Sequence, residues 1–162
     1  MLTRERVSIG AHRGWRSDHS AENSLAAINE GAQRADYVEV DLRPAADDYV
    51  VWHNPTIRLP HRILPHRVSR LSTTILRRAV AEQNKGPLVR ACDLFRHYPW
   101  GLGKPLLLDL KFGSLPEDLI WFLRRFPALC CFGARTTTVL EQCFSITSDR
   151  GRIVAMPKFP WQ

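Results

Sequence analysis

The segment Tyr37-Val38-Glu39-Val40-Asp41-Leu42 decides the interpretation of this chain. Apolar residues alternate with charged ones over a short run, as they do in a β-strand. Side chains at positions i and i+2 of a strand point to the same face, so we expect Glu39 and Asp41 roughly 6–7 Å apart on one face. Two carboxylates on one face suit a hard divalent cation. The segment therefore predicts a strand that carries part of a metal site.

Short apolar runs and helical stretches alternate on both sides of this strand. We expect further strands at Val7–Ala11, Tyr49–His53, Pro105–Lys111, Leu129–Phe132 and Arg152–Met156. We expect helices at Ser24–Arg34, from Ser72 to about Gln83, at about Arg90–His97, from Ser114 to about Phe126 and at Thr138–Phe144, with an irregular loop at Pro55–Pro65. Strands that are mostly separated by helices favour an α/β fold with a parallel sheet, either open or closed into a barrel. No Gly-x-Gly-x-x-Gly or Walker-type loop follows the first strand, which counts against a nucleotide-binding open sheet.

Length and composition indicate one globular domain over residues 1–162. Of the 162 residues, 44% are hydrophobic and 24% are charged, which excludes a disordered or collagen-like protein. No apolar run approaches the ~20 residues that a membrane span needs, and the N-terminal residues lack the apolar region of a secretory signal. We therefore expect a cytoplasmic protein without a membrane span.

The cysteines fit the same compartment. The four of them, Cys92, Cys130, Cys131 and Cys143, follow no zinc-binding spacing. No local signature supports a catalytic cysteine. We expect buried thiols in a reducing environment.

The basic residues are concentrated in one segment. The chain has 23 Lys and Arg against 16 Asp and Glu, a formal net charge of +7. Six arginines with no acidic residue among them lie between residues 58 and 78: Arg58, Arg62, Arg67, Arg70, Arg77 and Arg78. Two interpretations stay open, a solvated loop and helix face or a patch that attracts phosphate-bearing ligands. We expect no nucleic-acid binding, because no zinc finger, helix-turn-helix or stacked-aromatic signature accompanies the charge.

Ionisable residues stand at the ends of four predicted strands, and in a parallel barrel those ends form the floor of the active site. They are His12 and Arg13, Glu39 and Asp41, His53, and Asp109 and Lys111. Converging charges are costly to bury unless they hold a ligand or a metal. This set therefore predicts an active site rather than structural ion pairs.

Each type of residue in this set suits one part of phosphate chemistry. Asp109 offers a third carboxylate from a neighbouring strand, and Lys111 shares its face. A cation beside Lys111 and Arg13 is in outline a phosphate site, because metal and basic groups share the anionic oxygens. His12 and His53 suit general acid–base catalysis at neutral pH, because the pKa of an imidazole is ordinarily near 6.5.

Four short motifs follow one another in the first 60 residues. They are Ile9-Gly-Ala-His-Arg-Gly14, Ala21-Glu-Asn-Ser24, Val38-Glu-Val-Asp-Leu42 and Val50-Val-Trp-His-Asn54. Their order and spacing resemble those of the glycerophosphodiester phosphodiesterase family. The later run Pro105–Lys111 is similar to a family strand that carries Glu-x-Lys.

The resemblance implies a TIM-type (β/α) barrel, a divalent cation (Mg²⁺ or Ca²⁺) and the hydrolysis of glycerophosphodiesters to glycerol 3-phosphate and an alcohol in lipid metabolism. It implies that the glycerol hydroxyl attacks phosphorus and that water then opens a cyclic phosphate. By resemblance, His12 and His53 are the acid–base pair, Glu39, Asp41 and Asp109 are the metal ligands, and Arg13, Lys111 and Glu22 bind the substrate.

Two departures from the family pattern fall in the site. Asn54 replaces an Asp after the second histidine, and Asp109 replaces a Glu, which shortens that ligand by one methylene. Two alternatives therefore stay open. One is a non-catalytic or fragmentary descendant that binds phosphorylated ligands, and the other is a related barrel enzyme of the phospholipase type.

The length bears on the barrel itself. A complete barrel of this type needs about 250 residues, whereas we count six predicted strands in 162 residues. We expect an incomplete barrel with about six of eight strands, whose first and sixth strands have open edges. Such a chain is expected to be marginally stable or to associate with itself through those edges.

Overall fold

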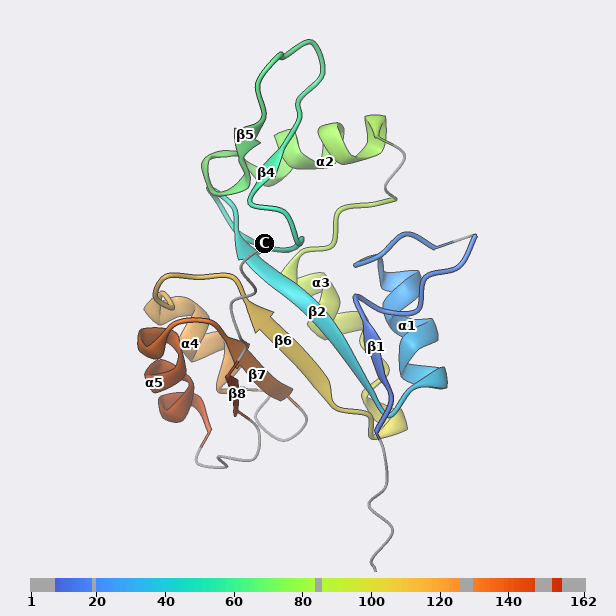
Figure 1. Ribbon diagram of the computed structural model, residues 1–162, viewed down its shortest axis with the longest axis vertical. Coiled ribbons are helices and arrows are strands. Elements are labelled where there is room, and N and C mark those ends of the chain that lie inside the picture. Colours follow the sequence, from blue (N-terminus) through green and yellow to red (C-terminus); the bar gives the residue numbers. More distant parts are fainter. Residues whose placement is uncertain (1–7, 19, 84–85, 126–129, 148–152, 156–162) are drawn as a thin grey trace, which may run out of the picture.

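The computed structural model describes residues 8–18, 20–83, 86–125, 130–147 and 153–155 (Figure 1). The strands are β1 (Gly10–His12), β2 (Tyr37–Pro44), β3 (Tyr49–Val51), β4 (Thr56–Ile57), β5 (His66–Arg67), β6 (Leu106–Leu110), β7 (Cys130–Ala134) and β8 (Ile153–Ala155). The α-helices are α1 (Leu25–Arg34), α2 (Thr73–Glu82), α3 (Ala91–His97), α4 (Glu117–Leu123) and α5 (Thr137–Ile146), with 3₁₀ turns η1 (Val68–Arg70) and η2 (Trp100–Leu102). The expected strand ends at Val7, Leu129, Arg152 and Met156 and the helix end at Phe126 lie outside the described residues.

Six strands form one sheet. Five of them run parallel in the order β1-β2-β6-β7-β8, and β3 pairs with β2. Helices connect successive parallel strands, with α1 after β1, α4 after β6 and α5 after β7. This confirms the predicted α/β class and the six strands. Among the described residues, β1 and β8 are the outer strands of the parallel series, and β3 is paired with β2 alone.

The third predicted strand runs in the opposite direction from the one expected. The sequence predicts Tyr49–His53 among the parallel strands, but β3 ends at Val51 and pairs antiparallel with β2. A parallel crossover needs a dozen residues or more, whereas here only residues 45–48 separate the two strands. The resulting hairpin brings the chain back along β2, so that the backbone N of Trp52 donates to the O of Asp41 at 3.0 Å. His53 therefore reaches the middle of β2 from a hairpin.

The parallel strands separate an apolar face from a polar one. Alternate residues of β2 and β6 are buried against the helices in the main core: Val38, Val40, Leu42, Leu106, Leu108 and Leu110. Because side chains alternate along a strand, Glu39, Asp41 and Asp109 occupy the opposite face. Helix α1 covers part of the apolar face and begins at Ser24, whose side chain accepts a bond from the first turn, and Ser72 caps α2 in the same way.

A second buried cluster lies beneath α2, away from the main core. It consists of Val50, Ile57, Val68, Leu71, Leu76, Ala79, Val80 and Leu88. The segment expected to be an irregular loop contributes to this cluster, because β4 within it pairs antiparallel with β5. Residues 56–83 thus form a small unit built on the β2–β3 hairpin, and we call this unit the arm.

No disulfide joins the four cysteines, as predicted, but Cys92 and Cys131 are only half-buried rather than buried. Cys130 and Cys143 are buried, and burial raises the pKa of the Cys143 thiol to about 11. A thiol protonated at neutral pH is a poor nucleophile. Within the described residues, no helix has the length and apolar character to cross a bilayer.

Candidate active site

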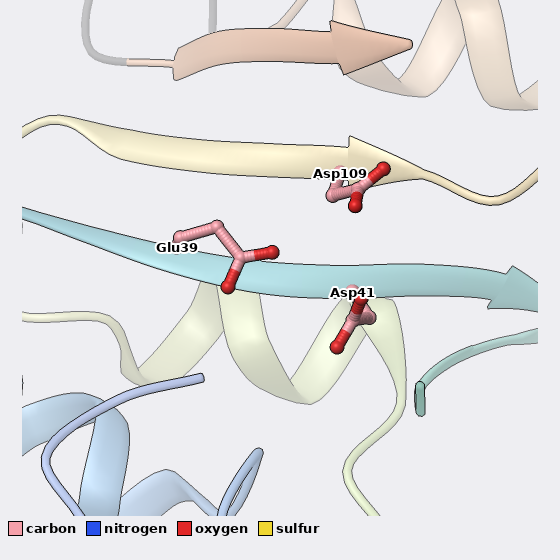
Figure 2. A group of neighbouring side chains, drawn as sticks. All are labelled: Glu39, Asp41 and Asp109. Atoms are coloured by element: carbon pink, nitrogen blue, oxygen red, sulfur yellow. The ribbon is translucent and has the colours of Figure 1, made fainter. Parts of the chain in front are cut away.

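Three buried carboxylates meet on the polar face of the sheet. Asp41 on β2 lies opposite Asp109 on β6, and Glu39 is two residues before Asp41 on the same face. Figure 2 shows the three side chains gathered where the two strands run side by side. One oxygen of each lies within 4.8 Å of the others. Glu39 is 5% exposed, Asp41 1% and Asp109 2%, so the cluster is withdrawn from water.

Basic groups surround the cluster. The Nζ of Lys111 lies 3.0 Å from Asp41 Oδ1 and also contacts Asp109 Oδ2. The Nε of Arg13 lies 3.2 Å from Asp41 Oδ2, and the backbone N of Arg13 donates to Glu39 Oε2 at 3.0 Å. Three negative charges in a buried space are tolerable because these cations and donors face them.

The two carboxyls of β2 respond oppositely to this environment. Burial and the neighbouring charge of Asp41 raise the pKa of Glu39 to about 7. Burial also acts to raise the pKa of Asp41, but the Lys111 ammonium and the hydrogen bond from Asn23 together hold it below its ordinary value. Near pH 7, Glu39 is therefore partly protonated, and an additional positive group beside it would favour its charged form.

The residues present fit a divalent cation. Within the described part of the chain, the buried Asp109 Oδ1 has no hydrogen-bond partner, an arrangement that is costly unless the oxygen meets a ligand. Carboxylate oxygens are the ligands that Mg²⁺ and Ca²⁺ prefer. The three predicted metal ligands are thus brought together, with an acceptor available on Asp109.

A tight turn after β1 positions His12 and Arg13. Gly14 has a φ of 81°, and a Cβ at this position would lie 2.5 Å from the carbonyl carbon of Ala27 on α1. Glycine therefore allows the turn to approach the helix. His12 Nε2 lies 3.8 Å from Glu39 Oε2, while its exposed imidazole stays open to solvent. Burial of part of the ring and the charge of Arg13 lower the pKa of His12, which favours the neutral form at pH 7.

The predicted substrate residue Glu22 is joined to this turn. Arg13 Nη1 lies 3.2 Å from Glu22 Oε2. The next residue, Asn23, donates from Nδ2 to Asp41 Oδ2 at 3.1 Å. Arg13 thus lies between an exposed and a buried carboxylate, and Asn23 fixes the buried one.

His53 stands on the other side of the cluster. Its Nδ1 lies 3.0 Å from Asn54 Oδ1, and its backbone O accepts from Arg43 Nη2 at 2.6 Å. A cavity of about 350 Å³ adjoins it, lined by Arg16, Ala21, Glu22, Asn23, Trp52, His53 and Asn54. The cavity lies between the motif of Glu22 and the hairpin of His53, where a small ligand would touch both.

Three residues of the site were not singled out by the sequence: Asn23, Arg43 and Arg135. Asn23 lies within a quoted motif, and Arg43 is two residues beyond Asp41 on β2, so both had a local signal. Arg135 follows β7 and brings Nη2 to 3.5 Å from Asp109 Oδ2. The pairing of β6 with β7 places Arg135 beside Asp109, and no motif in the sequence predicts this position.

Comparisons with known proteins identify the fold. The chain matches no protein-family model and no curated protein. It is similar to a glycerophosphodiester phosphodiesterase from Agrobacterium tumefaciens, with a TM-score of 0.66, 22% identity and coverage of 87% of this chain and 63% of that one. The glycerophosphodiester phosphodiesterase from Thermotoga maritima matches with a TM-score of 0.65 and 21% identity, over 87% of this chain and 60% of that one. An Oleispira antarctica phosphodiesterase in complex with the product sn-glycerol-3-phosphate matches with a TM-score of 0.64 and 18% identity, over 91% of this chain and 64% of that one.

These likenesses confirm the predicted TIM-type fold with part of the barrel. The chain spans less than two thirds of the length of each of the three structures. The parallel strands, the hairpin and the acidic cluster therefore belong to a portion of such a barrel.

Proposed function

We propose that this chain is a metal-dependent phosphodiesterase that hydrolyses glycerophosphodiesters to glycerol 3-phosphate and an alcohol. The observation that carries the proposal is the cluster of Glu39, Asp41 and Asp109, whose oxygens lie within 4.8 Å of one another beside Lys111 and Arg13. The likeness to solved glycerophosphodiester phosphodiesterases supports the same conclusion.

In this proposal the three carboxylates hold one divalent cation, Mg²⁺ or Ca²⁺. The bound ion would supply positive charge that neutralises the phosphoryl oxygens. Asp109 Oδ1 is ready to act as a ligand, because it has no hydrogen-bond partner among the residues that the structure describes. Lys111 and Arg13 bind the remaining anionic oxygens of the phosphate, and Glu22 holds the Arg13 guanidinium in place at 3.2 Å.

The two histidines carry the protons. With one hydrogen donated from Nδ1 to Asn54 Oδ1, a protonated His53 carries a second proton on Nε2 that it can give to the departing alcohol oxygen. One imidazole takes the proton of the attacking glycerol hydroxyl, and the other gives a proton to the departing alcohol oxygen. His12 suits the neutral, accepting role, because burial and Arg13 lower its pKa. Water then opens the cyclic phosphate with the two roles exchanged.

Release of glycerol 3-phosphate from glycerophosphocholine tests the proposal. We expect product with Mg²⁺ or Ca²⁺, none with EDTA, and none from the His12→Ala variant. His61→Ala is the matched control, because His61 is an exposed histidine in the arm, outside the acidic cluster. A folded wild-type protein that releases no product with any divalent cation would contradict the proposal.

A second candidate is a binding protein for phosphorylated ligands without turnover. It is favoured by Asn54, which cannot supply the negative charge of the family's Asp, and by the ammonium of Lys111 between Asp41 and Asp109. Binding of glycerol 3-phosphate without hydrolysis of any glycerophosphodiester would select this candidate. A phospholipase-type activity is distinguished by comparing hydrolysis of glycerophosphocholine with that of intact phospholipid.

Two further parts of the proposal concern the setting. A cytoplasmic role in lipid metabolism fits the four reduced cysteines. Self-association fits the sheet edges that β1 and β8 leave among the described residues. Cell fractionation tests the first, and the molecular mass in solution tests the second.

A further inference from the structure

The arm projects from the same end of the sheet as the site. In Figure 1 the loop between β4 and β5 stands at the top, beyond the ends to which the arrows of β2 and β6 point. Asp109 lies one residue before that end of β6, opposite Asp41 on β2. Because the arm has a buried cluster of its own beneath α2, it is a built structure and not a loose connection.

Large aliphatic side chains are exposed on the arm. Ile63 is 91% exposed and Leu64 is 73% exposed. They lie between Pro60 and Pro65 in the loop that the β4–β5 pairing closes. Removing aliphatic side chains of this size from water is favourable. An adjacent pair held out in water in this way points to a partner with an apolar interior.

Positive charge lies near the exposed pair Ile63 and Leu64, which we call the tip of the arm. The six arginines between Arg58 and Arg78 are all exposed, and among the described residues only Arg78 forms a salt bridge, to Glu82. Between Asp48 and Glu82 the chain has no acidic residue. A groove of about 800 Å³ runs between the tip and α2, with Arg58, Arg62 and Ile63 on one wall and Ala79 on the other. The arm thus combines exposed aliphatic residues with exposed arginines, five of which form no salt bridge among the described residues.

This combination distinguishes between anionic partners. Proteins that bind single-stranded nucleic acid stack its bases on aromatic side chains, and no aromatic residue lies between Trp52 and Phe95. A membrane surface with anionic lipids offers phosphate groups for guanidinium ions and an apolar layer for aliphatic side chains. The chemistry of the arm matches the second.

We propose that the arm docks on the surface of an anionic lipid bilayer, with Ile63 and Leu64 in the interface and Arg58 and Arg62 on lipid phosphates. Docking at this end of the sheet turns the acidic cluster and its adjoining cavity toward the membrane. The protein lies on the bilayer and does not cross it. The docking does not depend on the proposed hydrolysis, so the two are tested separately.

Co-sedimentation with vesicles tests the docking. We expect the 162-residue chain to bind vesicles of phosphatidylcholine with 30% phosphatidylserine, to release them at high salt, and to bind pure phosphatidylcholine much more weakly. Arg58→Gln with Arg62→Gln should lower the partition coefficient about 30-fold. Ile63→Ser with Leu64→Ser should lower it more than about 100-fold at unchanged charge.

A charge-matched variant serves as the control. Arg34→Gln with Arg124→Gln removes two exposed arginines from α1 and from the end of α4, away from the arm, and should bind like the wild type. Circular dichroism and thermal unfolding check that each variant is folded. Equal binding by the wild type and by the variant with Ile63→Ser and Leu64→Ser, which we call the tip variant, would overturn the proposal. Binding of neutral and anionic vesicles with the same affinity would overturn it, as would tight binding of a single-stranded oligonucleotide that the tip variant retains.

Discussion

Replacing Lys111 by Met removes the positive charge that the structure places between two carboxylates. The Lys111 side chain is 7% exposed, and those of Asp41 and Asp109 are 1% and 2% exposed. Removing one partner of a buried ion pair typically costs about 3–5 kcal/mol. Because Arg13 and Arg135 still face the two carboxylates, we expect a loss near the lower end, about 3 kcal/mol.

The loss is measured by urea unfolding at pH 7 in EDTA, followed by circular dichroism. Lys104→Met is the matched control, because Lys104 precedes β6 at the end away from the cluster, and it should change the free energy of unfolding by less than about 0.5 kcal/mol. A saturating divalent cation should then restore stability to the Lys111→Met variant, about 2.7 kcal/mol at a concentration of 100 times its Kd. The wild type should gain less, since the cation competes with the Lys111 ammonium for the same oxygens.

Two results would refute this reasoning. One is a Lys111→Met variant as stable in EDTA as the Lys104→Met control. The other is a destabilised variant that no divalent cation restores, because the carboxylates would then not be the place where the cation acts. If Lys111→Met does not fold, Lys111→Arg keeps the charge and should retain most of the stability.

Further predictions concern pH, two substitutions and assembly. The pKa of Glu39 is about 7 in the folded protein and ordinarily 4.5, so protonated Glu39 stabilises the metal-free protein most below pH 4.5, and the free energy of unfolding should fall by roughly 3 kcal/mol as the pH rises to 7. Urea unfolding should show a flatter pH profile for Glu39→Gln. An unchanged slope would contradict the raised pKa. Asn54→Asp puts a carboxylate beside His53 Nδ1 and should raise turnover of glycerophosphocholine roughly tenfold, about 1.4 kcal/mol in favour of the protonated imidazole; unchanged turnover would show that the side chain has no electrostatic role. Asp109→Glu lengthens one ligand and should tighten cation binding in calorimetry by roughly tenfold, whereas weaker binding would mean that the shorter ligand fits better. Light scattering after gel filtration should give a mass above that of one chain, and a stable monomer with a cooperative transition would argue against pairing through β1 and β8.

The sequence predicts well those parts of the fold that depend on neighbours in the chain. Ser24 and Ser72 begin helices because a serine side chain satisfies the first-turn amides locally. Glu39 and Asp41 share a face because the period of a strand is two. The direction of β3 was mispredicted, although the short connection at residues 45–48 contained the information that it must be antiparallel.

What the sequence could not supply depends on pairing across the sheet. The position of Asp109 opposite Asp41 follows from the register of β2 with β6, and the approach of Arg135 follows from β7 beside β6. Within the arm, an irregular loop was expected at Pro55–Pro65 because Pro60 and Pro65 interrupt any pattern, whereas β4 lies inside this segment and pairs with β5 just beyond it. Its exposed Ile63 and Leu64 could be identified only once the surrounding core was known.

The central claim is that the acidic cluster holds the cation required for hydrolysis of a glycerophosphodiester. Its most direct test is a cation titration of glycerol 3-phosphate release from glycerophosphocholine, with the wild type and the Asp41→Asn variant side by side. We predict release by the wild type that saturates with Mg²⁺ or Ca²⁺ and at least a 100-fold loss in the variant at every cation concentration, roughly 2.7 kcal/mol of transition-state stabilisation. Equal release by the two proteins, or release by the wild type in EDTA, would contradict the claim.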